Sequence, residues 1–329
     1  MAEPAGWSLT ESDPGVFTGI LHELGVRGVQ VEELWGLDAD LLKELEPVYA
    51  LIFLFKWVGN GDPSTMDGKL EEPAGTHYFA HQVINNACAS IALLNAALNI
   101  RDPNVQLGDE LSNLQAFSEG LDPETRGWTL SNSEKLREVH NSFARSDPFH
   151  LEDHRPDDPT EDAYHFIAYL PIGDELYELD GLKPKPVSHG KIEGGREKWT
   201  DAARGVLERR IATYPAGEVM FNLMALTGRR SRLEQRLQQL EAVGTTASGE
   251  EQAERVDVMD RLAGIDERMK DWETENALRR HNYIELIHAM LVELAKQDKL
   301  SPQIAAAKEK MKERVAERRA KGQEMMEED

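Results

Sequence analysis

The chain has 329 residues, of which 60 are acidic and 37 basic, so its formal net charge is −23. Hydrophobic residues make up 40% of the chain, which excludes wholesale disorder and predicts one large domain or two ordinary ones. The negative charge argues against nucleic acid and against an anionic membrane surface as partners, whereas a basic partner would be attracted.

The acidic excess is concentrated in the first two thirds of the chain. Residues 1–230 contain 38 acidic and 20 basic side chains, a net charge of −18, whereas residues 231–329 contain 22 and 17, a net charge of −5. Cys88 is the only cysteine, so the chain can form neither an internal disulfide nor a cysteine-based zinc finger. With no secretory leader pattern and no apolar run of bilayer length, we expect a soluble protein of a reducing, intracellular compartment.

The first 228 residues show the patterns of a mixed α/β domain. Helical periodicity predicts helices over 87–98 and 132–143. Apolar, β-rich runs predict strands at 50–57, 164–170, 175–179 and 219–226.

Residues 229–329 instead predict an all-helical extension. Leucines 233, 237 and 240 recur at helical spacing, and the pattern resumes from Val258 to Trp272 after a Gly/Thr/Ser break. Two antiparallel helices explain this pattern best. A third helix over 283–294 and a charged C-terminal helix after Pro302 should follow.

The single cysteine lies where a thiolate would be favoured. Asn85 and Asn86 are candidate caps of the helix that carries Cys88, which would place the thiol in the first turn. A free cysteine among apolar residues is more often buried and inert. Its position alone therefore leaves both interpretations open.

A histidine and an aspartate on two consecutive strands form the second candidate feature. If a tight turn sets Pro171 opposite Asp174, the same register sets His165 directly opposite Asp180, with Cβ atoms about 5 Å apart. A carboxylate at that distance can orient an imidazole for proton transfer. An ordinary cross-strand polar pair remains the alternative.

Gln82, six residues before Cys88, could donate its amide to a developing oxyanion. Together with Cys88, His165 and Asp180 it completes the parts of a cysteine hydrolase. A metal site at one of two histidine pairs, His77 with His81 or His150 with His154, is a weaker alternative, because neither pair has a glutamate in the HExxH arrangement.

The chain resembles the ubiquitin C-terminal hydrolases, a family of papain-like cysteine proteases. The motifs that carry the resemblance are GW at 6–7, ESDPGVF at 11–17, GVQVEELW at 28–35, LIFLFKW at 51–57, QVINNAC at 82–88, YHF at 164–166 and LYELDGL at 176–182. RRHNY at 279–283 and AKEK at 307–310 extend it to the long, proteasome-associated form of the family.

The resemblance implies a papain-like α+β catalytic domain over 1–228, with an antiparallel central sheet flanked by helices. It also implies a helical extension and adaptor-docking tail over 229–329. Cys88 matches the nucleophile, His165 the general base and acid, Asp180 the residue that orients the histidine, and Gln82 the oxyanion-hole glutamine. Trp35, Val219 and Phe221 match positions that meet ubiquitin, and residues 146–162 match a loop that crosses above the active site.

The implied activity is thiol-dependent hydrolysis of the bond after the C-terminal glycine of ubiquitin, without cofactor or metal, in the cytoplasm and nucleus. The implied partner is a proteasomal ubiquitin receptor with a deubiquitinase-adaptor domain, and a related adaptor of a chromatin-remodelling complex is the family's other partner. The alternative function is a catalytically silent or autoinhibited ubiquitin-binding scaffold that docks on an adaptor.

Overall fold

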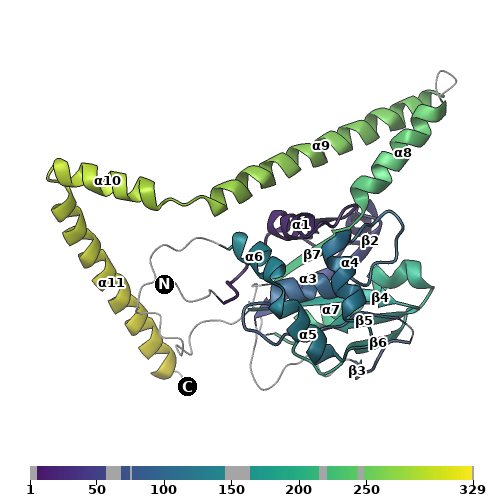
Figure 1. Cartoon of the computed structure of the whole chain (residues 1–329), viewed down its shortest axis with the longest axis horizontal. Coiled ribbons are helices and arrows are strands. Elements are labelled where there is room, and N and C mark those ends of the chain that lie inside the picture. Colours follow the sequence, from purple (N-terminus) through teal and green to yellow (C-terminus); the bar gives the residue numbers. More distant parts are fainter. Residues whose placement is uncertain are drawn as a thin grey trace. The chain divides into compact units, whose positions relative to one another are not determined.

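The computed structural model describes residues 6–56, 68–74, 76–144, 164–214, 221–243 and 248–327. The described strands form one seven-stranded sheet in the order β1-β7-β2-β4-β5-β6-β3, and all neighbouring pairs are antiparallel (Figure 1). The strands are β1 (Gln30–Glu33), β2 (Val48–Lys56), β3 (Lys69–Leu70), β4 (Tyr164–Ile172), β5 (Glu175–Leu179), β6 (Val187–Lys191) and β7 (Asn222–Thr227).

The described ranges also contain eleven α-helices and one short 3-10 helix. They are α1 (Pro14–Glu23), α2 (Ala39–Glu44), α3 (Cys88–Ala97), α4 (Gly108–Phe117), α5 (Pro123–Asn132), α6 (Glu134–Ser142), the short 3-10 helix η2 (Arg196–Lys198), α7 (Trp199–Ile211), α8 (Arg229–Val243), α9 (Gly249–Arg280), α10 (Ile284–Lys296) and α11 (Leu300–Glu327). The predicted mixed fold, an antiparallel sheet flanked by helices and followed by further helices, is confirmed. No helix in the described ranges is both long and apolar enough to cross a bilayer.

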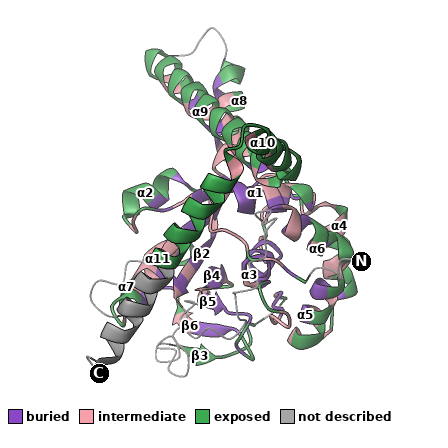
Figure 2. Ribbon diagram, turned by 90° about the vertical axis from the view of Figure 1, so that its left-hand side faces the viewer, coloured by how far each residue is buried: buried purple, intermediate pink, exposed green. Residues whose placement is uncertain are grey.

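Strand β2 has a hydrophobic run from Val48 to Phe55, and both of its faces are covered. Ala50 and Ile52 belong to the larger hydrophobic core, which α1 and α3 complete. Leu51, Phe53 and Phe55 belong to a second core, which α7 completes. A strand buried on both faces has a continuous rather than an alternating hydrophobic pattern, and Figure 2 shows the central strands β2, β4 and β5 mostly in the colour of buried residues.

Three strands, β1, β3 and β6, have no matching prediction from the sequence. β3 has only two residues, and β6, with the sequence VSHGK, contains a glycine and no run of β-formers. β3 and β6 lie at one end of the sheet order, so pairing with neighbouring strands decides their conformation more than local propensity does.

By its packing the chain divides into two compact units. The first includes the sheet, its helices and also α8 and α9, up to Arg280, and the second includes α10 and α11. The predicted boundary between residues 228 and 229 falls where β7 gives way to α8. Packing therefore joins α8 and α9 to the sheet domain.

The predicted pair of antiparallel helices is α8 and α9. Leu233 and Leu240 of α8 form one buried cluster with Val258 and Ile265 of α9. Outside this cluster, Arg236 forms an ion pair with Glu254 at 2.7 Å. The hairpin thus has its own small core, whose members recur at seven-residue spacing on both helices.

Helix α9 also packs directly on α1. The side-chain amide of Asn276 donates to the carbonyl oxygen of Gly15 at 3.1 Å, and Arg268 pairs with the buried Glu32 at 2.8 Å. The guanidinium of Arg280 lies 3.9 Å from the ring centroid of Phe143. A Cβ atom at Gly15 would lie only 2.6–2.9 Å from three atoms of the Trp272 side chain, so glycine allows this close approach.

We therefore expect Gly15→Ala to lower the free energy of unfolding by about 1–3 kcal/mol, because the added methyl group overpacks the α1–α9 contact. Gly205→Ala in α7 is the matched control: its Cβ atom would meet only Arg209, at 3.5 Å. The control should gain about 0.5–1 kcal/mol of helix stability. Urea unfolding of the full chain measures both values, and a stabilised Gly15→Ala variant would contradict the proposed close contact.

Candidate functional site

Cys88 is the first residue of α3, as predicted, and its side chain is partly accessible. The rest of the helix is buried, which fits its small and apolar sequence. The predicted asparagine caps are wrong: the cap position is Ala87, and no side chain accepts a hydrogen bond there. Asn86 instead turns the chain with a φ of 66°, and its amide donates to the carbonyl oxygen of Trp7 at 3.0 Å. The first-turn N–H groups of α3 therefore have no side-chain cap to satisfy them.

His165 and Asp180 are joined by a buried hydrogen bond. The Nε2 atom of His165 lies 2.7 Å from Oδ1 of Asp180, and the two residues are 4% and 0% exposed. Asp180 follows the last residue of β5, and Oδ1 also accepts from the backbone N–H of Leu182 at 2.9 Å. The backbone of the turn thus fixes the orientation of the Asp180 carboxylate, and the carboxylate orients the His165 imidazole.

The predicted register of the β4–β5 hairpin is wrong by one residue on each strand. Ile172 pairs with Glu175, so the loop residues are Gly173 and Asp174, and Gly173 has a φ of +61°. A positive φ at the first loop position is typical of the tight hairpin turns that match strand twist. His165 and Asp180 are therefore diagonal rather than directly opposed.

The predicted contact survives this error for a geometric reason. A shift of one residue on each of the two strands changes the pairing by two positions, and a shift of two keeps every side chain on the same face. Diagonal neighbours on one face remain within reach of a long side chain. The imidazole of His165 spans that diagonal.

The environment of His165 favours the imidazolium form. Burial by itself would lower its pKa, but hydrogen bonds to Asp180 and Cys88, together with the negative charges of both groups, raise the pKa from 6.5 to about 9. The hydrogen bond between His165 and Cys88 means that the thiol lies within reach of the imidazole ring. A cysteine hydrogen-bonded to a histidine that a carboxylate orients is the arrangement of nucleophile and base in a cysteine hydrolase.

This shift predicts a pH dependence of stability. Because the pKa of folded His165 lies above its unfolded value, the stabilisation is fully present below pH 6.5 and is lost as the pH rises through about 9. We expect the free energy of unfolding to decrease over that interval by an amount on the order of 3 kcal/mol from this group. Asp180→Asn, which keeps the size of the side chain, should flatten the decrease in urea unfolding measured across the interval. Equal pH slopes for the two proteins would rule out the pair as the cause.

Gln82 lies next to the turn that carries Asp180. Its backbone N–H donates to the carbonyl oxygen of Gly181 at 2.9 Å, and its side-chain Nε2 donates to the carbonyl oxygen of Ile84 at 3.2 Å. A primary amide has two N–H donors, so one remains for another acceptor. The structure thus connects the segment before Cys88 to the strand end that holds Asp180.

The residues predicted to meet ubiquitin have different environments. Trp35 is 88% exposed, an unusual state for so large an apolar side chain. Phe221 is half-buried and stacks on Phe53 with ring centroids 5.7 Å apart, so it also belongs to the second core. Val219 and the predicted crossover loop, residues 146–162, lie outside the described residues.

The histidine pairs show no built metal site in the described part of the chain. His77 contacts Glu72 at 2.9 Å, and the ring of His81 packs edge-on against Phe79. Across the described ranges, no three His, Cys, Asp or Glu side chains come together as a metal site would require. His150 and His154 lie outside these ranges.

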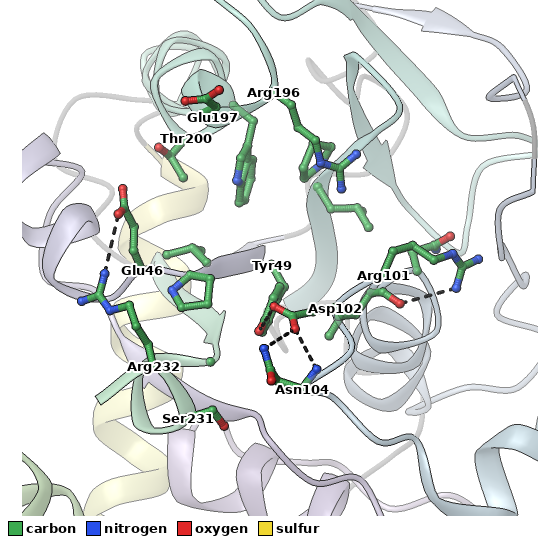
Figure 3. Close-up of a pocket in the computed structure, with 18 of the residues that line it drawn as sticks. Glu46, Tyr49, Arg101, Asp102, Asn104, Arg196, Glu197, Thr200, Ser231 and Arg232 are labelled. Atoms are coloured by element: carbon green, nitrogen blue, oxygen red, sulfur yellow. Dashed lines mark hydrogen bonds and ion pairs between the residues drawn. The ribbon is translucent and has the colours of Figure 1, made fainter. Parts of the chain in front are cut away.

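A cavity of about 810 Å³ lies at the other end of the sheet, among the start of β2, the loop after α3 and the starts of α7 and α8 (Figure 3). Within it the Tyr49 hydroxyl donates to Asp102 at 2.9 Å, and Arg232 pairs with Glu46 at 3.7 Å. Val48 lines this cavity, whereas Phe55, seven residues along β2, pairs with His165. That separation is about 23 Å along the strand, so the cavity is distinct from the cysteine site.

A buried charged cluster next to Asp180 has no counterpart in the sequence prediction. Glu178, 1% exposed, contacts Lys183 at 2.8 Å, Arg210 at 3.2 Å and His189 at 3.3 Å. Its signal in the sequence is a glutamate between Tyr177 and Leu179, two residues before Asp180 and thus on the same side of the extended chain. Its partners come from three other elements, so spacing alone could not identify them.

The fold and the site together define a class. A mixed α/β protein with a cysteine at the start of a buried helix, hydrogen-bonded to a histidine that a buried aspartate orients, has the constitution of a cysteine hydrolase. The family model described as "Ubiquitin carboxyl-terminal hydrolase, family 1" matches residues 7–212, and the model "Ubiquitin carboxyl-terminal hydrolases" matches residues 260–300. The chain belongs to the ubiquitin carboxyl-terminal hydrolase family and is a cysteine-type ubiquitinyl hydrolase.

Individual relatives resemble the chain over nearly its whole length. Ubiquitin carboxyl-terminal hydrolase ubh-4 of Caenorhabditis elegans is 41% identical over 95% of this chain and 96% of its own. Ubiquitin carboxyl-terminal hydrolase isozyme L5 of Dictyostelium discoideum is 34% identical over 95% of this chain and 98% of its own. The crystal structure of Trichinella spiralis UCH37 bound to ubiquitin vinyl methyl ester is similar with a TM-score of 0.65 and 36% identity, covering 82% of this chain and all of that one.

Proposed function

We propose that Cys88 is the nucleophile that cleaves the bond after the C-terminal glycine of ubiquitin. The observation that carries this assignment is that His165 is hydrogen-bonded to both Cys88 and the buried Asp180. The Cys88 thiolate attacks the glycine carbonyl, and a tetrahedral oxyanion forms. The second N–H of Gln82 and the backbone N–H of Cys88 stabilise this oxyanion.

His165 then moves the protons. As an imidazolium it donates a proton to the leaving amine, while the bond from the carbonyl carbon to nitrogen breaks and a thioester remains on Cys88. The neutral ring next takes a proton from water, whose hydroxide attacks the thioester and releases the ubiquitin carboxylate and the thiolate. The raised pKa of His165, about 9, keeps the ring charged for the first transfer at neutral pH.

A ubiquitin probe with a C-terminal vinyl methyl ester tests the assignment directly. We expect one covalent adduct on the full chain, mapped by peptide mass spectrometry to Cys88, and none on Cys88→Ala. Binding of the probe without labelling would instead support the alternative function, a catalytically silent or autoinhibited ubiquitin-binding scaffold.

We propose Trp35 as part of the surface that binds ubiquitin, because it is 88% exposed and apolar. Val219 and Phe221 complete the proposed patch. Trp35→Ala should raise the KM for a ubiquitin–fluorophore amide about 10-fold, which corresponds to about 1.4 kcal/mol, and leave kcat unchanged. Trp128→Ala, at a tryptophan that is 46% exposed, is the matched control. A fall in kcat without a change in KM would exclude a binding role for Trp35.

We further propose that α10 docks on an adaptor, the proteasomal ubiquitin receptor, and that the protein therefore acts in the cytoplasm and nucleus. The support is that α10 has no buried residue, as its colour in Figure 2 shows. Its apolar side chains Leu286 and Met290 are 54% and 58% exposed. These two positions lie on one face, four residues apart. Apolar faces of this kind mark sites of protein association.

The double variant Leu286→Glu/Met290→Glu tests docking in the full chain. We expect loss of co-purification with the proteasome and unchanged hydrolysis of the fluorophore amide, because the substitutions lie in the second compact unit. Retained proteasome binding would exclude α10 as the docking surface. Binding to a chromatin-remodelling complex, assayed in parallel, shows whether a related adaptor uses the same face.

A further inference from the structure

One short turn supports three of the residues that the proposed mechanism uses. Asp180 begins it and bonds to His165. The carbonyl oxygen of Gly181, the next residue, accepts the backbone N–H of Gln82 at 2.9 Å, and the N–H of Lys183 donates to the carbonyl oxygen of Asp180 at 3.0 Å. A displacement of this turn would therefore move the orienting carboxylate and the oxyanion donor together.

The last residue of the turn is anchored in the interior. The ammonium of Lys183 lies 2.8 Å from Oε1 of Glu178, and the residues are 9% and 1% exposed. Lysine is rarely buried without a partner, because removing its charge from water is costly. Glu178 lies on β5 before Asp180, and Lys183 follows Asp180. The ion pair therefore connects the two sides of the turn.

Glu178 is itself held from two other elements. Its Oε2 accepts from Arg210 of α7 at 3.2 Å and lies 3.3 Å from Nε2 of His189 on β6. Burial by itself would raise the pKa of Glu178, but the charges of Arg210 and Lys183 and the hydrogen bond from His189 hold it well below its usual range. Because Arg210 already neutralises the carboxylate, the particular contribution of Lys183 is geometric: it closes the turn onto the sheet.

We propose that Lys183 is a positioning residue for hydrolysis, which by its ion pair with Glu178 holds the turn 180–183 so that Asp180 and Gln82 keep their working positions. This inference rests on the proposed roles of Cys88, His165, Asp180 and Gln82. Lys183 touches neither substrate nor reacting atoms, and it acts through Asp180 and the backbone of Gly181. A displacement of about 1 Å at such a support can cost up to about 100-fold in rate.

Lys183→Met tests the proposal, because it keeps the length of the side chain and removes the ammonium. In the full chain we expect kcat for a ubiquitin–fluorophore amide to fall about 10-fold with KM unchanged, and Lys183→Arg to recover most of the loss. Lys185→Met, at an exposed lysine in the same loop, is the matched control and should retain wild-type kcat. An unchanged kcat in Lys183→Met would overturn the proposal.

A double-mutant cycle separates positioning from general stability. If Lys183 acts in part through Asp180, then Lys183→Met should reduce kcat in an Asp180→Asn background by clearly less than its effect of about 10-fold in the wild type, because only the path through Gly181 and Gln82 remains. Fully additive losses would overturn the proposal, because they would show that Lys183 acts independently of Asp180. If Lys183→Met does not fold, Lys183→Gln replaces it in the cycle, because it removes the ammonium and so the ion pair with Glu178 while keeping a polar end at this site.

The proposed function can fail separately from this inference. Full activity of Cys88→Ala would disprove the catalytic assignment whatever Lys183 does. An essential Cys88 combined with a fully active Lys183→Met would disprove only the positioning role.

Discussion

Cys88→Ala is expected to reduce hydrolysis of a ubiquitin–fluorophore amide by at least about 10⁴-fold, because no other group in the site can form the thioester. Cys88 is the only cysteine, so the variant also loses every thiol that could substitute for it. Stopped-flow fluorescence with a large excess of enzyme measures the residual rate. A thiol titration confirms that the substitution is complete.

The control for this variant is ubiquitin binding. Because Trp35 and the sheet are unchanged, the Kd for ubiquitin should stay within about 3-fold of wild type, and thermal unfolding should be similar. Cys88→Ser is a useful companion, because a hydroxyl of ordinary pKa is a far weaker nucleophile next to the same imidazole. Substantial activity of either variant would show that the nucleophile is another group.

Glu178→Gln is expected to have the largest effect on stability, a loss of about 3–5 kcal/mol in the free energy of unfolding. Removing the charge leaves Arg210 and Lys183, which are 5% and 9% exposed, without their common buried carboxylate. Removing one partner of a buried ion pair costs about this much because the remaining charge stays buried without its closest counter-charge. Glu208→Gln, at an exposed glutamate of α7, is the control and should stay within about 0.5 kcal/mol of wild type.

The same carboxylate predicts acid sensitivity. Its pKa is depressed in the folded state, so its stabilisation is fully present above the usual value of 4.5 and is lost as the pH falls towards the depressed value. Glu178→Gln should therefore lose less stability than wild type on acidification below pH 4.5. Parallel acid-unfolding curves for the two proteins would contradict this explanation.

Features that depend on residues close together in the sequence were predictable from the sequence. The continuous apolar run of β2 predicted a buried central strand, and the pattern of small and apolar residues after Cys88 predicted the helix that carries it. The contact between His165 and Asp180 was also predictable, although the register was not, because a two-position change keeps the side-chain face. The asparagine cap failed because Asn86 bonds to Trp7, far away in the sequence.

The sequence by itself indicated the chemistry of this protein, since the residues proposed as nucleophile, base with its carboxylate and oxyanion donor lie in recognisable local patterns. Only the tertiary structure decided what supports them. Glu178 meets Arg210 from α7 and His189 from β6, and Asn276 of α9 meets Gly15 of α1 across 261 positions. Such contacts depend on which surfaces meet when elements pack, and hydrophobic periodicity describes one element at a time. The same holds for the acidic residues. Their number follows from the sequence, but only the structure shows that Glu178 is buried while most other described carboxylates are accessible to water.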